Sequence, residues 1–479
     1  MSEFKGRIVS GLLWLGSASA LTQTVSWLFT LLIARMLTPA DYGLFAIAGV
    51  YIGILEFLNE FGIGSTIVQK ENITRKEVSG LFALSLYWSI ALCSLTYCFA
   101  SKIAITLHSE ELVPILRVLS FSFIISAFKN IQYNMMVREM RFREIAKIEA
   151  LARILTALLS YLLALQGFGV WTLVSSYLVY SFIQACCYSL RQRIYFAFRL
   201  SFSDLKEHIV FGLQIISGRF IEAISGRTQT MVIGKLLGMD LLGVYTFAQV
   251  LSFRPIEMIV TVLNQVFFPI YSRLQNDENT RTNYLLKTME IEMLCILPLC
   301  LIMACTADIF IPLILGDRWI STIPYMQVFS VLAIFIFLSS QATMLSISAG
   351  KPRLQILYVA VSFALLVGFF FLLGTHGKEK GILLSWIIVC PPVSLLYFGL
   401  MLRNLHVPLL SMLRSIVLPC AVATSVTVTT LVCKRIWSEP HWINLIAILT
   451  TSGAAGISSL LVFDRKKVGN VIQTLRSAV

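Results

Sequence analysis

The sequence predicts an all-α integral membrane protein, and two observations carry that prediction. The first is composition: 57% of the 479 residues are hydrophobic and 13% are charged, whereas an ordinary soluble chain carries about 25% charged residues. The second is the arrangement of the apolar residues, which form stretches of membrane-spanning length along the whole chain with short connections between them. The mean hydropathy of +0.81 agrees with both observations. A soluble globular fold and a sizeable extramembrane domain are therefore excluded.

Fourteen apolar stretches are long enough to cross a bilayer, because about 20 apolar residues span its hydrocarbon core. In chain order they cover approximately residues 11–34, 43–67, 79–101, 113–134, 148–166, 170–190, 209–234, 241–268, 288–315, 323–348, 354–374, 381–402, 411–433 and 442–462. The connection at 166–170 is so short that it predicts a tight helical hairpin. An even number of spans places both chain ends on one side of the membrane.

Basic residues are unevenly divided between the two sides. Lys and Arg concentrate in the connections on the side of the termini, where Arg138, Arg141, Arg143 and Lys147 form the densest group. The positive-inside rule places that side, and both termini, in the cytoplasm. The group serves either as a topology anchor or as a contact for anionic lipid head groups. The net charge of +13 is therefore assigned to the membrane, and no nucleic acid partner is expected.

Cysteine and histidine do not form a metal-binding pattern. Nearly all of the ten cysteines lie inside apolar stretches without CxxC spacing, and the five histidines show no HxxxH or HxxE spacing. The cysteines suit small hydrophobic positions in membrane helices. We expect neither a metal nor a cofactor.

An internal repeat is visible within the chain. KGRIVSGL at 5–12 matches KEHIVFGL at 206–213, and RMLTPADYG at 35–43 matches KLLGMDLLG at 235–243. Six predicted helices separate the copies, so both have the same membrane orientation and form parallel repeats. The predicted organisation is a six-helix lobe at 1–200, a second at 201–405, and helices 13 and 14 with a cytoplasmic tail at 406–479.

Three arginines are expected deep inside membrane spans. Arg219 and Arg254 fall near the middles of predicted helices seven and eight, and Arg227 lies about two turns from Arg219. A charged residue at such depth costs about 2.5–3.5 kcal/mol on insertion scales and should face protein or water. Glu222 and Glu257 follow two of them at i+3, which allows a neutralised pair on one helix. The alternative is a cationic cavity that binds an anionic group, since the guanidinium fork suits phosphate.

Other basic residues inside spans lie nearer helix ends, where a long side chain reaches the interface, so a snorkelling role is favoured for them. These residues are Arg117, Lys129 and Arg153.

Carboxylates also fall inside predicted spans. Glu56 and Glu60 lie one turn apart on one face of the second helix, and Asp308 lies on the ninth. Two adjacent carboxylates in a low-dielectric bundle resist ionising together, which makes ion coupling one interpretation. Pairing with an arginine across the cavity is the other.

Several segments resemble the Wzx-type polysaccharide flippases of the multidrug/oligosaccharidyl-lipid/polysaccharide exporter superfamily, particularly the branch for exopolysaccharide, colanic-acid-like and teichuronic-acid-like polymers. The segments are ARMLTPADYGLFAI at 34–47, FGIGSTIVQKENIT at 61–74, VREMRFREIAKIEALAR at 137–153, GFGVWTLV at 167–174, FFPIYSRLQND at 267–277 and GDRWISTIPYMQVFSVLA at 316–333. They lie largely at helix ends and connections, so they are interpreted as fold signatures.

The resemblance implies two six-helix lobes around a central cavity, with the last two helices outside. It also implies a flippase and not an enzyme: an undecaprenyl-diphosphate-linked oligosaccharide is turned over from the inner to the outer leaflet of the cytoplasmic membrane, for exopolysaccharide or O-antigen-type lipopolysaccharide synthesis. A polymerase and a chain-length regulator are the partners it implies. A cationic cavity would shelter the polar head while the apolar tail stays in lipid.

Three alternatives remain open. An ion-coupled drug or metabolite exporter would share the architecture, although three central arginines disfavour a cationic substrate. A membrane glycosyltransferase, polymerase or ligase would need a larger extramembrane loop than the sequence offers. A passive scramblase would need no coupled carboxylates.

Overall fold

The computed structural model describes residues 23–60, 64, 67–68, 73–106, 109–192, 202–273, 278–348, 352–405, 407–437, 439 and 441–463. The backbone alone is described at 106, 202–225, 262–273, 278–281, 283, 347–348, 352, 409, 461 and 463. Every secondary-structure element among these residues is helical. The prediction of an all-α fold is confirmed.

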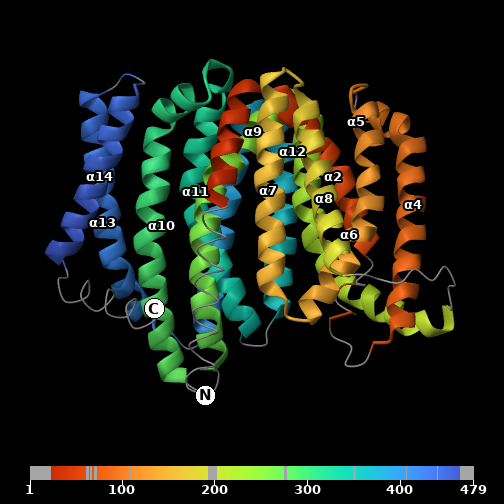
Figure 1. Ribbon diagram of the computed structural model, residues 1–479. Helices are drawn as coiled ribbons and strands as arrows, with labels where there is room; N and C mark the ends of the chain where they lie inside the picture. Colours follow the sequence, from red (N-terminus) through yellow and green to blue (C-terminus); the bar gives the residue numbers. More distant parts are fainter. Residues whose placement is uncertain are drawn as a thin grey trace. The chain divides into compact units, whose positions relative to one another are not determined.

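The helices follow one another with short connections (Figure 1). A helix over 23–36 is followed by α2 (Pro39–Glu60), α4 (Arg75–Thr106), α5 (Leu112–Leu119), α6 (Phe121–Arg138), α7 (Phe142–Leu165), α8 (Val170–Arg191), α9 (Phe202–Arg273), α10 (Glu278–Ile314), the 3₁₀ turn η1 (Asp317–Trp319), α11 (Thr322–Ser348), α12 (Pro352–Asn404), α13 (Leu409–Ile436) and α14 (Trp442–Phe463). Within the described residues, 11 helical stretches are long and apolar enough to cross a membrane. The protein is a multi-pass membrane protein.

Two of these elements, α9 and α12, each consist of two helices. Gly238 interrupts α9 with φ of 82°, and Lys378 interrupts α12 with φ of 45°. Both values lie at positive φ, which a helix does not contain and which glycine adopts most readily. The two breaks fall between predicted stretches, at 234–241 and 374–381. The total of fourteen spans stays a prediction, because the first predicted stretch begins before the described residues.

Capping residues explain where α2 and α4 begin. The Thr38 amide donates to Asp41 Oδ2 at 2.8 Å, and the Asp41 amide donates to Thr38 Oγ1 at 3.3 Å, which makes a reciprocal capping box. Thr74 and Glu77 repeat this arrangement at α4, with distances of 2.6 and 3.2 Å. The TPAD sequence is therefore a helix-start signal.

The α7–α8 connection confirms the predicted tight hairpin. Gly167 and Gly169 have φ of 78° and 53°, so the turn depends on residues without a Cβ. Asp41 of α2 also approaches this turn, since a Cβ built on Gly169 would lie 3.0 Å from Asp41 Oδ1. Two of the segments that carry the resemblance thus meet at one point.

The described chain divides into two compact units, which we call the first unit, ending at Gly243, and the second unit, beginning at Val244. The division falls later than the predicted lobe boundary at residue 200, because the part of α9 around its break at Gly238 packs on α2. A Cβ on Gly43 would overlap the carbonyl oxygen of Met239, and a Cβ on Gly243 would overlap that of Pro39. The organisation into two six-helix lobes and a C-terminal pair stays a prediction.

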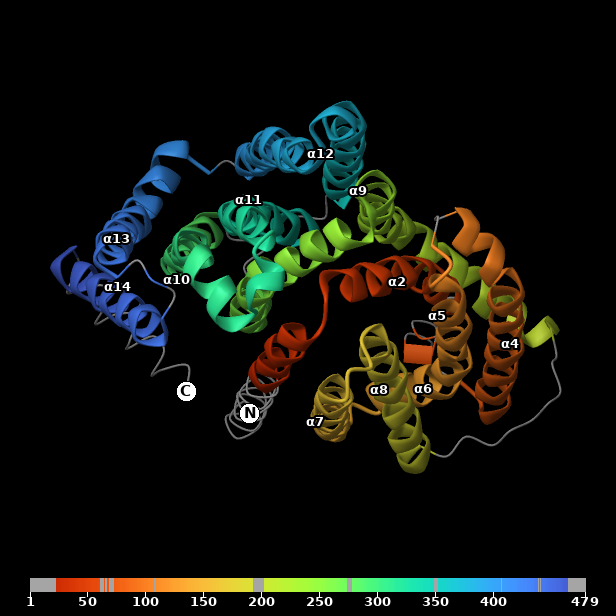
Figure 2. The same cartoon turned by 90° about the horizontal axis from the view of Figure 1, so that it is seen from above.

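Each unit has its own packing. In the first, α6 packs against α4 and α8, and α7 against α8 (Figure 2). In the second, α10 packs against α11 and α13, and α13 against α14. Among the described residues of the second unit, a core cluster gathers apolar residues of α9 to α13 around Met289, Phe337 and Met401.

Candidate functional site

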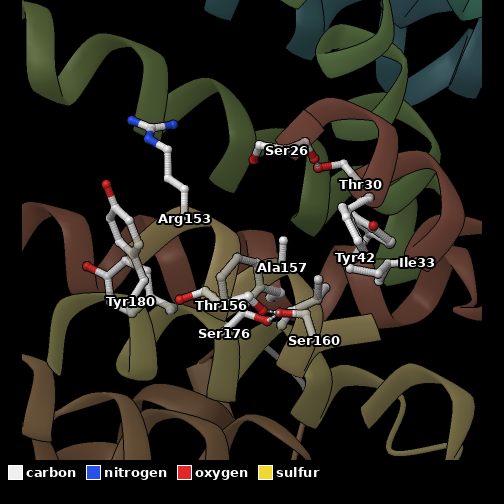
Figure 3. Close-up of a pocket in the computed structure, with 14 residues that line it drawn as sticks. Ser26, Thr30, Ile33, Tyr42, Arg153, Thr156, Ala157, Ser160, Ser176 and Tyr180 are labelled. Carbon is white, nitrogen blue, oxygen red and sulfur yellow. Dashed lines mark hydrogen bonds between the residues drawn. The ribbon is translucent and has the colours of Figure 1, made fainter. Parts of the chain in front are cut away.

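The first unit contains a pocket of about 370 Å³ between the helix over 23–36, α2, α7 and α8 (Figure 3). Hydroxyl groups dominate its polar lining, with one cation. The polar residues are Ser26, Thr30, Tyr42, Arg153, Thr156, Ser160, Ser176, Tyr177 and Tyr180. Apolar residues such as Phe29, Ile33 and Phe45 complete the wall.

Serine contacts hold α7 and α8 together at the pocket wall. The Ser160 and Ser176 hydroxyl groups are hydrogen-bonded to each other, and each lies within hydrogen-bond distance of a backbone carbonyl of its own helix. Because a hydroxyl has one proton, one serine donates to the other and the second donates to its carbonyl. In contrast, the Thr156 hydroxyl is buried and makes no hydrogen bond within the described part of the chain. A buried hydroxyl without a partner costs free energy unless a ligand or water satisfies it. Thr156 is therefore a ready contact for a polar ligand.

Arg153 supplies the pocket's positive charge, and a carboxylate network on α7 and α8 holds it. Glu149 accepts hydrogen bonds from Tyr180 at 2.6 Å, Gln184 at 2.7 Å and Tyr188 at 2.9 Å. Arg153 lies 3.9 Å from Glu149, and its guanidinium stands 5.8 Å from the Tyr180 ring centroid. Glu149 already has three close donors, so Arg153 is oriented by the network while its side chain stays 42% exposed.

Tyr177 joins this pocket to two residues that the sequence predicted. It lines the pocket, lies beside Glu56 of α2 and is within electrostatic range of Arg227 of α9. The Arg227 guanidinium contacts Gly53, since a Cβ atom added to Gly53 would lie 2.8 Å from Arg227 Nε. Gly53 precedes Glu56 by one turn on the same helix face. The structure therefore brings Glu56 and Arg227 together beside the pocket.

Other predicted residues of the first unit lie elsewhere. Glu60 is exposed at the end of α2. Its neighbour Asn59 is buried and structural, donating to the Phe123 carbonyl at 3.2 Å and accepting from Ser89 at 2.8 Å. Arg219 and Glu222 are on α9, but their side chains lie outside the described residues.

The predicted residues of the second unit form ion pairs. Arg254 and Glu257 pair at 3.2 Å on one helix and are 63% and 58% exposed, as the i+3 spacing allows. Asp308 of α10 pairs with Lys434 of α13 at 2.7 Å, and Lys434 also donates to the Cys305 carbonyl at 3.0 Å. Asp308 thus takes the charge-pairing arrangement and ties two helices together.

The basic group at the α6–α7 connection is partly neutralised. Arg141 binds Glu144 at 2.8 Å and Glu139 at 3.3 Å, while Arg143 and Lys147 are exposed. The pairing of Arg141 stabilises the turn. The exposed pair keeps both predicted roles open, anchor and lipid contact.

Sequence reasoning missed Glu149 and gave Arg153 only a snorkelling role. The signal was present: Tyr180, Gln184 and Tyr188 recur every four residues on α8, which makes a polar stripe facing Glu149 and Arg153 at i and i+4 on α7. Hydroxyls, an amide and a guanidinium are groups that bind sugars and phosphates. No cluster of potential metal ligands occurs among the described residues.

Comparisons with known proteins agree with this architecture. The model of a family described as "Polysaccharide biosynthesis protein" matches residues 32–324. The chain is 23% identical to the lipopolysaccharide biosynthesis protein WzxC of Escherichia coli (strain K12), over 69% of this chain and 68% of that protein. It is 22% identical to the teichuronic acid biosynthesis protein TuaB of Bacillus subtilis (strain 168), over 74% of each.

Among solved structures, the lipid II flippase MurJ in an inward closed conformation is similar, with a TM-score of 0.74 and 13% identity. The match covers 95% of this chain and 100% of that chain. A transporter of the multidrug resistance MATE family matches with a TM-score of 0.61 over 81% of this chain and 98% of its own. Both similarities show the fold.

Proposed function

The chain belongs to the polysaccharide biosynthesis protein family, and on that premise we propose that it flips a diphosphate-linked oligosaccharide lipid across the cytoplasmic membrane. The expected carrier is undecaprenyl diphosphate, and the direction is from the inner to the outer leaflet. The two relatives named above, by their names, act in lipopolysaccharide and teichuronic acid biosynthesis, and MurJ flips lipid II. These names support a lipid-linked saccharide as the substrate class.

The observation that carries the proposal is a hydroxyl-lined pocket inside a membrane-spanning unit, with Arg153 on its wall and Arg227 linked to it through Tyr177. Such a substrate has a polar head that hydrocarbon excludes and an apolar tail that stays in lipid. Drug-sized ligand sites measure about 300–1,000 Å³, so a pocket of about 370 Å³ fits a diphosphate or one sugar, and not a whole repeat unit.

In this proposal Arg227 and Arg153 contact the diphosphate and the neighbouring hydroxyls contact sugar. Arg219 and Arg254 remain proposed as further cations on the substrate's route. Glu56, Glu60, Glu222, Glu257 and Asp308 remain proposed for ion coupling or charge pairing, with pairing supported for Glu257 and Asp308 by their observed partners.

The proposed setting is the cytoplasmic membrane, with both termini in the cytoplasm and a polymerase and a chain-length regulator as partners. The uneven distribution of Lys and Arg supports the orientation. The substrate is the class that such a polymerase would consume at the outer face.

The test uses a bacterial strain that lacks the gene for this chain. Loss of surface polysaccharide with accumulation of an unpolymerised, inward-facing lipid-linked oligosaccharide, both reversed by the intact gene, is the expected result. Arg153→Gln and Arg227→Gln should fail to restore export at normal protein levels. Arg414→Gln is the matched control, because Arg414 is exposed on α13.

The competing function is export of a drug or metabolite by the same architecture. The MATE-family similarity supports only a shared fold. Normal surface polysaccharide in the deletion strain, together with increased sensitivity to cationic compounds, would replace the flippase proposal with this one.

A further inference from the structure

The second unit contains a buried carboxylate that lacks the hydrogen bonds a carboxylate needs. Glu292 lies on α10, and its residue is 1% exposed. Neither of its carboxyl oxygens makes a hydrogen bond within the described part of the chain. Glu292 is eight residues from the start of the apolar stretch Tyr284–Ile314, or about 12 Å along the helix axis. The group is therefore at membrane depth and inside the protein.

The neighbouring element α11 presents an amide to this carboxyl group. Gln341 lies beside Glu292 and is also 1% exposed. Its Nε2 makes no hydrogen bond of normal geometry with any described residue. Two polar groups thus face each other in a buried space, with hydrogen-bonding capacity left unused on both.

Among the described side chains, none supplies a positive charge to balance an ionised Glu292 carboxylate. On α10, Met289 and Ile296 lie one turn away and belong to the apolar core cluster. The buried Thr288, also one turn away, donates its hydroxyl proton to the Leu285 carbonyl at 2.9 Å. The described titratable groups of this cluster are the Cys300 thiol and the Tyr284 phenol of α10 and the phenols of Tyr358 and Tyr397 of α12. The Cys295 thiol lies near Glu292 on the same helix.

The remaining helices of the cluster contribute apolar residues to it. From α13 these are Met412 and Ile416, and from α9 they include Phe253 and Ile256. The charged residues of that part of α9, Arg254 and Glu257, are exposed and paired with each other. An ionised Glu292 would therefore have no cationic partner among the described side chains, which is far more costly than a neutral acid.

We propose that Glu292 is a proton-binding site, neutral in the conformation described here, that releases its proton when movement of α10 against α11 admits water. Protonation converts the carboxylate into a carboxylic acid, and release returns the proton to water, so no other reactant is needed. A proton fits better than a metal cation, because hard cations take six or more oxygen ligands. Glu292 and Gln341 together offer two carboxyl oxygens and one amide oxygen within the described part of the chain. The role of the site in driving transport rests on the proposed function, but its detection does not.

Infrared spectroscopy of the full chain in lipid vesicles tests the inference without substrate. As pH rises, exposed glutamates ionise near their ordinary pKa of about 4.3, whereas the carbonyl band of the Glu292 acid should persist well above that pH. Glu292→Gln should remove this band. The exposed Glu439 provides the matched control, and Glu439→Gln should retain the band.

A second variant covers the case in which Glu292→Gln does not fold. Gln341→Leu removes the facing amide and should shift the frequency of the same band. Absence of a persistent band in the wild-type chain, or its survival in Glu292→Gln, would overturn the proposal. Loss of the band on adding Na⁺ at constant pH would also overturn it, in favour of a metal cation.

The export assay then connects the site to transport. Glu292→Gln should fix the site in its neutral form and remove the dependence of export on the pH gradient. A normal gradient dependence in this variant would contradict the coupling role. If the flippase proposal failed in the deletion strain, the infrared result would still stand or fall by itself.

Discussion

Substituting Gly53 by alanine should displace Arg227 while leaving the protein folded. A Cβ at Gly53 would lie 2.8 Å from both Nε and Nη2 and 3.1 Å from Cζ of Arg227. Carbon and nitrogen atoms in normal contact lie about 3.5–4.0 Å apart, so the guanidinium must move by about 1 Å. The group is the end of a flexible side chain, which can move at small cost.

The expected effects on stability and on binding are opposite. Alanine replaces glycine inside a helix with a gain of about 0.5–1 kcal/mol, so the unfolding temperature should stay the same or rise slightly. A hydrogen bond to a charged group contributes about 1.5–3 kcal/mol, which corresponds to about one to two orders of magnitude in substrate affinity. Binding of the lipid-linked oligosaccharide to purified protein, with surface polymer as the cellular readout, measures this loss.

Gly49 provides the matched control on the same helix. It lies one turn before Gly53, and a Cβ built there meets nothing within 4 Å. Gly49→Ala should therefore bind and export normally. If Gly53→Ala behaved like Gly49→Ala in both assays, Arg227 would not be a substrate contact, and the assignment of the pocket would be wrong.

Three further outcomes are expected, each checked by thermal unfolding of the purified chain. Lys434→Met removes the 2.7 Å ion pair with Asp308, whose side chain is 39% exposed, so the free energy of unfolding should fall by about 1 kcal/mol. Adding Asp308→Asn to this variant should lower the stability little further. If the two losses were fully additive, the two residues would not be coupled. Tyr180→Phe removes a 2.6 Å hydrogen bond to the Glu149 carboxylate. The free energy of unfolding should fall by about 1.5 kcal/mol, because two other donors to this carboxylate remain. An unchanged unfolding temperature would argue against the network. Gly43→Ala and Gly243→Ala each place a Cβ atom against a backbone carbonyl. Each should lower the free energy of unfolding by about 1–3 kcal/mol, and the two losses should be similar. If either substitution left the stability unchanged, the two helices would separate easily at this contact.

Much of the fold was predictable because lipid imposes a simple rule on sequence. Apolar stretches of sufficient length must be helices, since every backbone polar group needs an internal partner. The α7–α8 hairpin and the breaks at Gly238 and Lys378 followed from stretch length and from turn residues. Packing was harder to predict, because nothing in the local sequence at 227–243 shows that this segment packs on α2.

The site residues that could be predicted are charged residues deep inside apolar stretches, and the others were not recognised from the sequence. Glu56 and Arg227 stood out as charges deep in apolar stretches, and the structure brings them to the same tyrosine. Arg153 lies near a predicted helix end, where snorkelling is the ordinary expectation, and only its Glu149 network shows otherwise. Glu292 falls near the start of the predicted stretch 288–315, where a charged residue would be expected at the membrane surface. In the structure α10 begins at Glu278, well before Glu292, and packing against other helices buries this residue.

The contact between the two repeat motifs has a consequence for the chain's symmetry. Pro39 and Gly43 in the first copy correspond to Met239 and Gly243 in the second, and each glycine contacts the carbonyl of the other copy's residue. The residue pair formed by the first copy with the second is repeated by the second copy with the first. Between identical chains, such a reciprocal contact is called isologous and indicates two-fold symmetry. Here one polypeptide contains both partners. Both copies of the motif are therefore under the same steric constraint, because a side chain at either glycine would overlap a backbone carbonyl of the other copy.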